Sequence, residues 1–211
     1  MKKIFESTRG IALATTLACG VSACAPLVLG GAALSTLVVT DRRTSGAQLE
    51  DEGIELRSVS RIRDAVGDRV HVNVTSYNRQ VLLTGEVGIA QDRETLQLVV
   101  SRVENVRSIV NELGVMGSST LTQRSSDSLV TGRVKAAFVD ARDLYANAFK
   151  VVTERGTTFL MGRVTQREAD RATEIARSTS GVQKVVRLLE IISEAELQGT
   201  LPQLAPVESK R

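Results

Sequence analysis

The sequence predicts an α+β fold made of two similar domains, each with the element order helix, strand, strand, helix, strand. Two observations predict this fold. One stretch of the chain repeats after 76 or 77 residues, and each copy combines two segments of helical spacing with short alternating runs. Such elements form a two-layer unit in which two helices cover one face of a three-stranded sheet.

The repeat is clearest around two glycines. The run Val-Leu-Leu-Thr-Gly-Glu-Val at 81–87 returns as Thr-Phe-Leu-Met-Gly-Arg-Val at 158–164, a shift of 77 residues, and later apolar positions return at a shift of 76. Gly85 and Gly162 each end an aliphatic run ahead of a helix. A missing side chain there allows a positive φ or a close backbone approach, so we expect both glycines to be structural.

Each copy is expected to open with an amphipathic helix, because apolar residues recur at helical spacing. These residues are Leu56, Val59, Ile62 and Val66 in the first copy, and Val130, Val134, Phe138 and Ala141 in the second. A hairpin should follow, since short alternating runs enclose a polar turn. The strand, turn and strand are 70–75, 76–80 and 81–87 in the first copy, and 149–153, 154–156 and 158–164 in the second.

A second helix and a closing strand complete each unit. Thr165 and Glu168 have the spacing of a capping box, which satisfies free backbone donors at a helix start. The apolar positions of the second helix are Leu96, Val99, Val100 and Val103 in one copy, and Ala172, Ile175, Ala176 and Thr179 in the other. The closing strands are expected at 106–115 and 182–192.

The domain organisation follows from the repeat and from composition. The segment between the copies is rich in Gly, Ser and Thr and indicates a flexible linker, and no proline falls inside either unit. We expect a signal peptide at 1–23, a lipidated tether at 24–52, the first domain at 53–116, a linker at 117–126, the second domain at 127–193 and a flexible tail at 194–211.

The N-terminus indicates a bacterial lipoprotein. A basic tip precedes a charge-free stretch that ends in Val-Ser-Ala-Cys, so Cys24 is the expected site of lipidation and the first residue of the mature chain. The other cysteine, Cys19, has polar Thr16 three residues before it. An uncleaved transmembrane helix is the alternative, although glycines and Pro26 interrupt the run. Ala25 and Pro26 replace the aspartate that favours inner-membrane retention, so an outer-membrane anchor facing the periplasm is expected.

Composition argues against two other classes of protein. The net charge of +3 falls to +1 once the signal peptide is removed, and aromatic residues make up 3% of the chain, which disfavours nucleic-acid binding. His71 is the single histidine, lies in an expected strand and has no second histidine or nearby cysteine with which to form a catalytic site. We find no metal-ligand spacing and no phosphate-binding loop, and we expect no catalytic residues, metal or cofactor beyond the acyl chains on Cys24.

The repeated pattern resembles the BON domain, a family named for bacterial OsmY and nodulation proteins. The resemblance is carried by a Val-rich strand, a polar turn, an aliphatic run into Gly-x-Val, a helix and a closing Gly-Val-x-x-Val-x-x-x-Leu at 181–189. The first copy departs from the pattern because it has Glu104-Asn105-Val106 where a glycine is expected just before the closing strand. With its lipid signal and two such domains, the chain resembles outer-membrane lipoproteins of this family.

The resemblance implies a function in binding. BON domains are regarded as non-enzymatic modules that associate with phospholipid, and their tandem lipoproteins are implicated in outer-membrane integrity. In such proteins the second domain contacts anionic lipid through its opening helix, here 127–141. This implies that Leu129, Gly132, Arg133 and Lys135 are available outside the core. A modest charge difference agrees, since 127–193 has eleven basic against eight acidic residues, whereas the first domain is balanced.

Two alternatives stay open at the level of sequence. Leu129 could belong to the core and Arg133 could be an ordinary solvated charge. The three-stranded sheets could also offer exposed edges to a partner strand, which would make the protein an interaction module that assists envelope or outer-membrane protein assembly.

Overall fold

The computed structural model describes residues 41–200, the last two by their backbone alone. These residues belong to one compact unit that spans Val39–Arg211. Cys24, the signal peptide, most of the expected tether and the end of the tail lie outside the described residues. The unit contains all three hydrophobic clusters of the described part, so a fragment that begins at Val39 retains the complete core.

The described residues confirm the predicted α+β order in both copies. The first copy consists of α2 (Ser45–Val66), a 3-10 turn (Gly67–Arg69), β1 (His71–Tyr77), β2 (Gln80–Val87), α3 (Ala90–Ser101), β3 (Ser108–Asn111) and β4 (Gly114–Val115). The second consists of α4 (Leu121–Asp140), a 3-10 turn (Ala146–Ala148), β5 (Phe149–Glu154), β6 (Thr157–Thr165), α5 (Gln166–Ser178) and β7 (Lys184–Ile192), and α6 (Glu194–Thr200) follows it.

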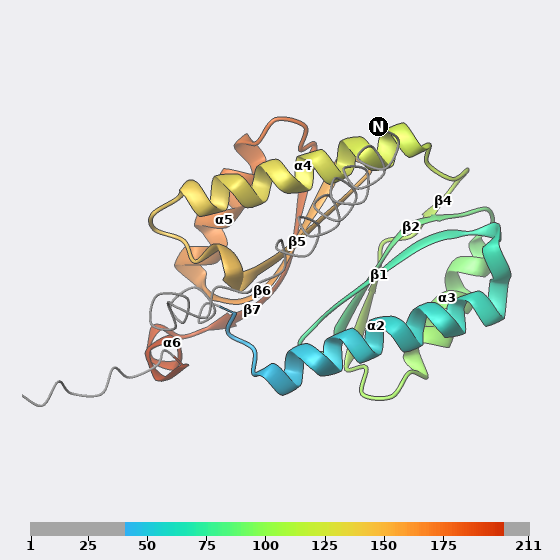
Figure 1. The fold of residues 1–211 in the computed structure, drawn as a ribbon, viewed down its shortest axis with the longest axis horizontal. Coiled ribbons are helices and arrows are strands. Elements are labelled where there is room, and N and C mark those ends of the chain that lie inside the picture. Colours follow the sequence, from blue (N-terminus) through green and yellow to red (C-terminus); the bar gives the residue numbers. More distant parts are fainter. Residues whose placement is uncertain (1–40, 201–211) are drawn as a thin grey trace, which may run out of the picture. The chain divides into compact units, whose positions relative to one another are not determined.

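Each sheet is built around the second strand of its hairpin. β2 pairs antiparallel with β1 and parallel with β3 and β4, and β6 pairs antiparallel with β5 and parallel with β7. In Figure 1, α2 and α3 lie on one side of the β1–β3 sheet, and α4 and α5 cover one face of the β5–β7 sheet. The closing strand of the first copy is broken because Leu113 turns into the core and its N–H binds the Asn111 side chain.

The hairpin turns are tighter than expected and are held by a buried aspartate in each copy. Asn78 and Arg79 have φ of 48° and 66°, and Arg155 and Gly156 have φ of 50° and 72°, which is typical of two-residue type I′ turns. An aspartate of each opening helix accepts the two turn N–H groups, at 2.7 and 2.8 Å for Asp51 and at 2.8 and 3.0 Å for Asp127. The aspartates therefore join each opening helix to its hairpin.

The core face of the first helix differs from the predicted one. Leu56 and Val59 are 74% and 41% exposed, whereas Ile62 and Val66 are buried as expected. The buried face of α2 also includes Asp51, Ile54 and Ser58. The helix is rotated in this way because Asp51 must point at the hairpin turn, and residues three and four positions apart follow it on the same side. In α4, the predicted Val130, Val134 and Phe138 are all buried.

The second face of each sheet is also buried, which the single-face prediction missed. Tyr77 and Leu82 of the first copy pack with Phe159 and Met161 of the second. Polar contacts join the copies as well: the Lys150 ammonium donates to Glu55 at 2.7 Å. β2 and β6 are therefore covered on both sides, and their near-continuous apolar sequence has the composition of a fully buried strand.

Regular structure extends beyond the predicted domain boundaries. α4 begins at Leu121, inside the segment expected as the 117–126 linker, because Thr120 and Gln123 form a capping box ahead of it. α2 begins at Ser45, inside the expected tether, and α6 occupies the start of the expected flexible tail. The helices α2 and α4 begin at their capping residues, Thr44 and Thr120. The predicted domain boundaries lay later because they were placed from the apolar repeat and from the content of small residues.

Candidate functional site

The four residues that the sequence singles out for lipid contact lie on the outer side of α4. Leu129 is 63% exposed, and Gly132, Arg133 and Lys135 lie outside the core as well. The core side of the same helix carries Val130, Val134 and Phe138 instead. The structure therefore removes the alternative in which Leu129 belongs to the core.

Two further apolar residues share this surface and were missed at the level of sequence. Leu121 and Val139 are 79% and 71% exposed. With 3.6 residues per turn, positions 121, 129, 132 and 139 fall on one side of the helix. Leu121 was overlooked because it was assigned to the linker. Val139 was overlooked because it does not share the helical spacing of the core residues of α4. We call Leu121, Leu129, Gly132 and Val139 the outer face of α4.

The cations beside the outer face are not neutralised by nearby acids. None of the ion pairs of the described residues includes Arg133 or Lys135. The Arg133 guanidinium makes one long contact, 3.5 Å, to the carbonyl of Ser180. It also lines a shallow groove together with Arg155 and Gln183. Both charges are therefore available to an anionic surface.

The first domain carries a similar helix with a different charge environment. At a shift of 76 residues, Leu56 and Arg57 of α2 correspond to Gly132 and Arg133 of α4. The Arg57 guanidinium is paired with Glu50 at 2.7 Å, and α2 carries further acids such as Glu52 and Glu55. The two helices thus present comparable apolar groups, but the equivalent arginines differ, since Arg57 is paired with a carboxylate and Arg133 contacts only a carbonyl.

The single histidine lies against a buried carboxylate. His71 Nδ1 lies 3.1 Å from Glu86, and Glu86 also binds Ser119 and Arg155. Burial opposes the charged form of Glu86, but the hydrogen bonds from Ser119, Arg155 and His71 outweigh it and hold the pKa of this carboxyl below its ordinary value. The group is therefore a charged acceptor in a network.

This network also gathers metal-ligating side chains that sequence spacing did not reveal. Donor atoms of His71, Glu86 and Glu154 all lie within 4.8 Å of one another. They come from β1, β2 and β5, so they meet only after the two sheets have packed. No local sequence signal could have found them.

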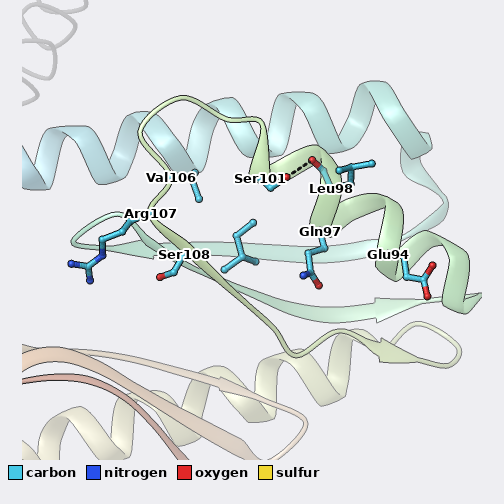
Figure 2. A pocket seen from close by; sticks show the side chains of 8 residues that line it. Glu94, Gln97, Leu98, Ser101, Val106, Arg107 and Ser108 are labelled. Atoms are coloured by element: carbon cyan, nitrogen blue, oxygen red, sulfur yellow. Dashed lines mark hydrogen bonds between the residues drawn. The ribbon is translucent and has the colours of Figure 1, made fainter.

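A groove lies between α3 and β3 in the first domain (Figure 2). Its volume is about 500 Å³, and its lining includes Gln97, Leu98, Ser101 and Ile109. β3 pairs with β2 along one edge, and its other edge has no partner strand within the described sheet. The corresponding groove of the second domain is bridged by an ion pair of 2.8 Å between Asp170 and Arg187. Among the described residues, no ion pair joins two lining residues of the first groove.

Comparison with known proteins identifies relatives of the whole arrangement. The family model described as BON domain matches twice, over residues 51–117 and 126–193. A protein of Haemophilus influenzae named "Outer membrane lipoprotein DolP" is 38% identical over 172 residues, which cover 80% of this chain and 89% of that protein. The "21 kDa hemolysin" of Actinobacillus pleuropneumoniae is 32% identical over 154 residues, which cover 72% of this chain and 79% of that protein.

Similarity to solved structures is weak. CdsD, described as a structural protein of the type III secretion system of Chlamydia trachomatis, is 14% identical, with 67% of this chain and 95% of that chain covered and a TM-score of 0.30. A score at this level supports no argument. Within residues 41–200, no helix has the length and apolar character that crossing a membrane requires.

Proposed function

Since the chain belongs to the BON-domain family and carries two such domains, we propose that it is a lipid-anchored outer-membrane protein that binds anionic phospholipid through its second domain and supports the integrity of that membrane. The observation that carries this proposal is the outer face of α4, where exposed apolar groups lie beside unpaired cations. The function is one of binding, without a catalytic step.

The anchor rests on Cys24 and on the similar lipoprotein. Acylation of this thiol would fix the chain to the membrane, because two or more acyl chains give stable anchoring where one gives only reversible binding. The name of the Haemophilus influenzae relative supports an outer-membrane location for the same arrangement. On this proposal, the folded unit lies in the periplasm, tethered within reach of the bilayer surface.

The outer face of α4 suits the boundary between acyl chains and headgroups. A helix of 20 residues is about 30 Å long, so it can lie along the surface with Leu121, Leu129 and Val139 directed at the apolar layer. Arg133 and Lys135 would then meet anionic headgroups. Each such cation contributes about 1 kcal/mol to binding at a negatively charged surface. The charge adds selectivity for anionic lipid, and the apolar groups add affinity.

Vesicle binding tests the proposal. We expect the fragment 39–211 to co-sediment with vesicles that contain phosphatidylglycerol and not with vesicles of phosphatidylcholine alone. Arg133→Glu should weaken binding more at low salt than at high salt, because screening already removes much of the attraction at high salt. Leu129→Asp should weaken binding at both salt concentrations.

The first domain provides the matched control. Arg57→Glu changes the corresponding position of α2 and should leave vesicle binding almost unchanged. If Arg57→Glu and Arg133→Glu reduce binding equally, or if folded Arg133→Glu binds as well as the parent, the assignment of the lipid site to α4 is wrong.

A protein-interaction role in outer-membrane assembly is the second candidate, and the open groove between α3 and β3 favours it. An extended partner segment could pair with the free edge of β3. A photo-cross-linking residue at position 98 should then capture an assembly protein in the cell, while the same residue at position 174, the repeat-equivalent site, should not.

A further inference from the structure

His71, Glu86 and Glu154 converge where the two domains meet. His71 and Glu86 are cross-strand partners of the first sheet, and Glu154 ends β5 of the second. All three offer donor atoms within 4.8 Å of one another. An imidazole nitrogen and two carboxylates form a donor set that suits Zn²⁺ and similar borderline cations, whereas Mg²⁺ prefers oxygen ligands alone.

Neighbouring groups hold the two carboxylates in place. The backbone N–H and the hydroxyl of Ser119 both donate to Glu86 Oε2 at 3.1 Å, and Asn73 Nδ2 donates to Glu154 at 2.9 Å. Partners of this kind orient metal ligands and commonly matter for affinity. The ring of His71 is partly accessible, with 19% of its side chain exposed, so an ion and a coordinating water can reach it.

The charge balance leaves room for a cation. Glu86 and Glu154 contribute two negative charges, and Arg155, whose Nη1 lies 3.1 Å from Glu86, contributes one positive charge. Arg155 is 39% exposed and can turn toward solvent. We propose that His71, Glu86 and Glu154 bind a divalent cation of the zinc class, which displaces Arg155 from Glu86 and ties the two BON domains together.

The required movement is small. Ligand atoms of a tetrahedral zinc site lie about 3.3 Å apart, as estimated from metal–ligand bonds of about 2 Å. The His71–Glu86 distance of 3.1 Å already matches this spacing, and the remaining donors, which lie within 4.8 Å, need to approach by at most about 1.5 Å to reach it. Side-chain rotation at the ends of strands supplies such a shift without altering the sheets.

Zinc chloride is the probe, and the untagged fragment 39–211 is the protein. It contains no cysteine and a single histidine, so zinc binding by thiols is avoided and the imidazole gives one resolved NMR signal. We expect one equivalent of Zn²⁺ to bind by calorimetry, to shift the His71 resonances and to raise the melting temperature. Magnesium chloride at the same concentration should do none of these.

Variants separate the site from adventitious binding. Both His71→Ala and Glu154→Gln should weaken Zn²⁺ binding by about tenfold or more, in protein shown to be folded by circular dichroism. Arg155→Gln should tighten binding several-fold because it removes the competing cation. Glu174→Gln, at an exposed glutamate, is the control and should bind like the parent. The proposal is overturned if saturating zinc leaves the His71 signal unmoved, or if folded Glu154→Gln binds zinc as tightly as the parent.

Discussion

Gly85 and Gly162 occupy the same place in the two domains and leave no room for a side chain. Gly85 has φ of 109°, and a Cβ atom there would collide with the carbonyl oxygen of His71. Gly162 lacks the positive φ, but its Cβ would lie 2.5 Å from the carbonyl oxygen of Ala148. The repeated glycine thus reflects a close approach to the backbone where the preceding strand begins, at His71 in the first copy and at Ala148, just before β5, in the second, with an added conformational demand in the first.

We predict that Gly85→Ala lowers the free energy of unfolding by about 2–3 kcal/mol, and that Gly162→Ala has a smaller effect of the same sign. The control is Gly132→Ala, because a Cβ atom at that position would have no neighbour within 4 Å and alanine favours a helix. Chemical denaturation measures all three. Equal stability of Gly85→Ala and the parent would show that the glycine is not a structural requirement.

At the scale of elements, a buried ion pair fastens the chain ahead of α2 to α5 of the second domain. Arg42 donates two hydrogen bonds of 2.7 Å to Glu168, and both side chains are almost fully buried. Burial opposes the charged form of Glu168, but the Arg42 guanidinium and the Thr165 N–H outweigh it and lower the pKa of this carboxyl. Glu168 also completes the capping box of α5, which the sequence predicted and the structure confirms.

Removal of one member of such a pair leaves the other charge buried and unpaired. We predict that Arg42→Ala lowers the free energy of unfolding by about 3 kcal/mol. Arg171→Ala serves as the control, since Arg171 pairs with Asp143 and Glu174 at the solvent-exposed surface and its loss should destabilise the protein far less. Thermal or urea unfolding distinguishes the two. Similar losses for both variants would contradict the role of the Arg42 pair.

The Arg42 pair also has a consequence for pH. The pKa of Glu168 lies below its ordinary value of 4.5, so the pair contributes its stability above that pH and loses it as the pH falls through the lower folded value. The tie between the chain ahead of α2 and the second domain should therefore hold throughout the neutral range and weaken only in acid.

At the scale of the whole molecule, the two sheets share a hydrophobic layer with a tyrosine in it. Tyr77 packs with Leu82, Phe159 and Met161, and its hydroxyl accepts a hydrogen bond of 3.2 Å from the N–H of Arg163. Burial, with the charge of Asp41, raises the pKa of Tyr77 to about 12 from 10.0. The neutral phenol is thus the form that the interface accommodates.

We predict that the contact between the domains weakens in alkali. A group whose folded pKa is raised contributes its stability below the unfolded value and loses it as the pH rises toward the folded value, here between 10.0 and about 12. Melting temperatures across this range should fall more for the parent than for Tyr77→Phe, which lacks the phenol proton. Parallel curves for the two proteins would show that Tyr77 does not govern the effect.

The sequence by itself determined the local and repeated features. Apolar spacing, turn residues and the capping box of Thr165 act within a few positions of one another, so they predicted the element order and the two copies. The outer position of Leu129 and Arg133 was implied by the family resemblance, and the structure decided it. The same patterns led to the BON-domain family, which the comparisons confirm.

Only the tertiary structure decided what depends on distant segments. The rotation of α2 that exposes Leu56 follows from Asp51 reaching the hairpin turn, and the second buried face of each sheet follows from packing of the two domains. Asn73 and Glu154 meet across 81 residues of chain. Such contacts form when whole sheet faces are buried against each other. The apolar spacing of a single strand or helix does not identify the surface against which it packs.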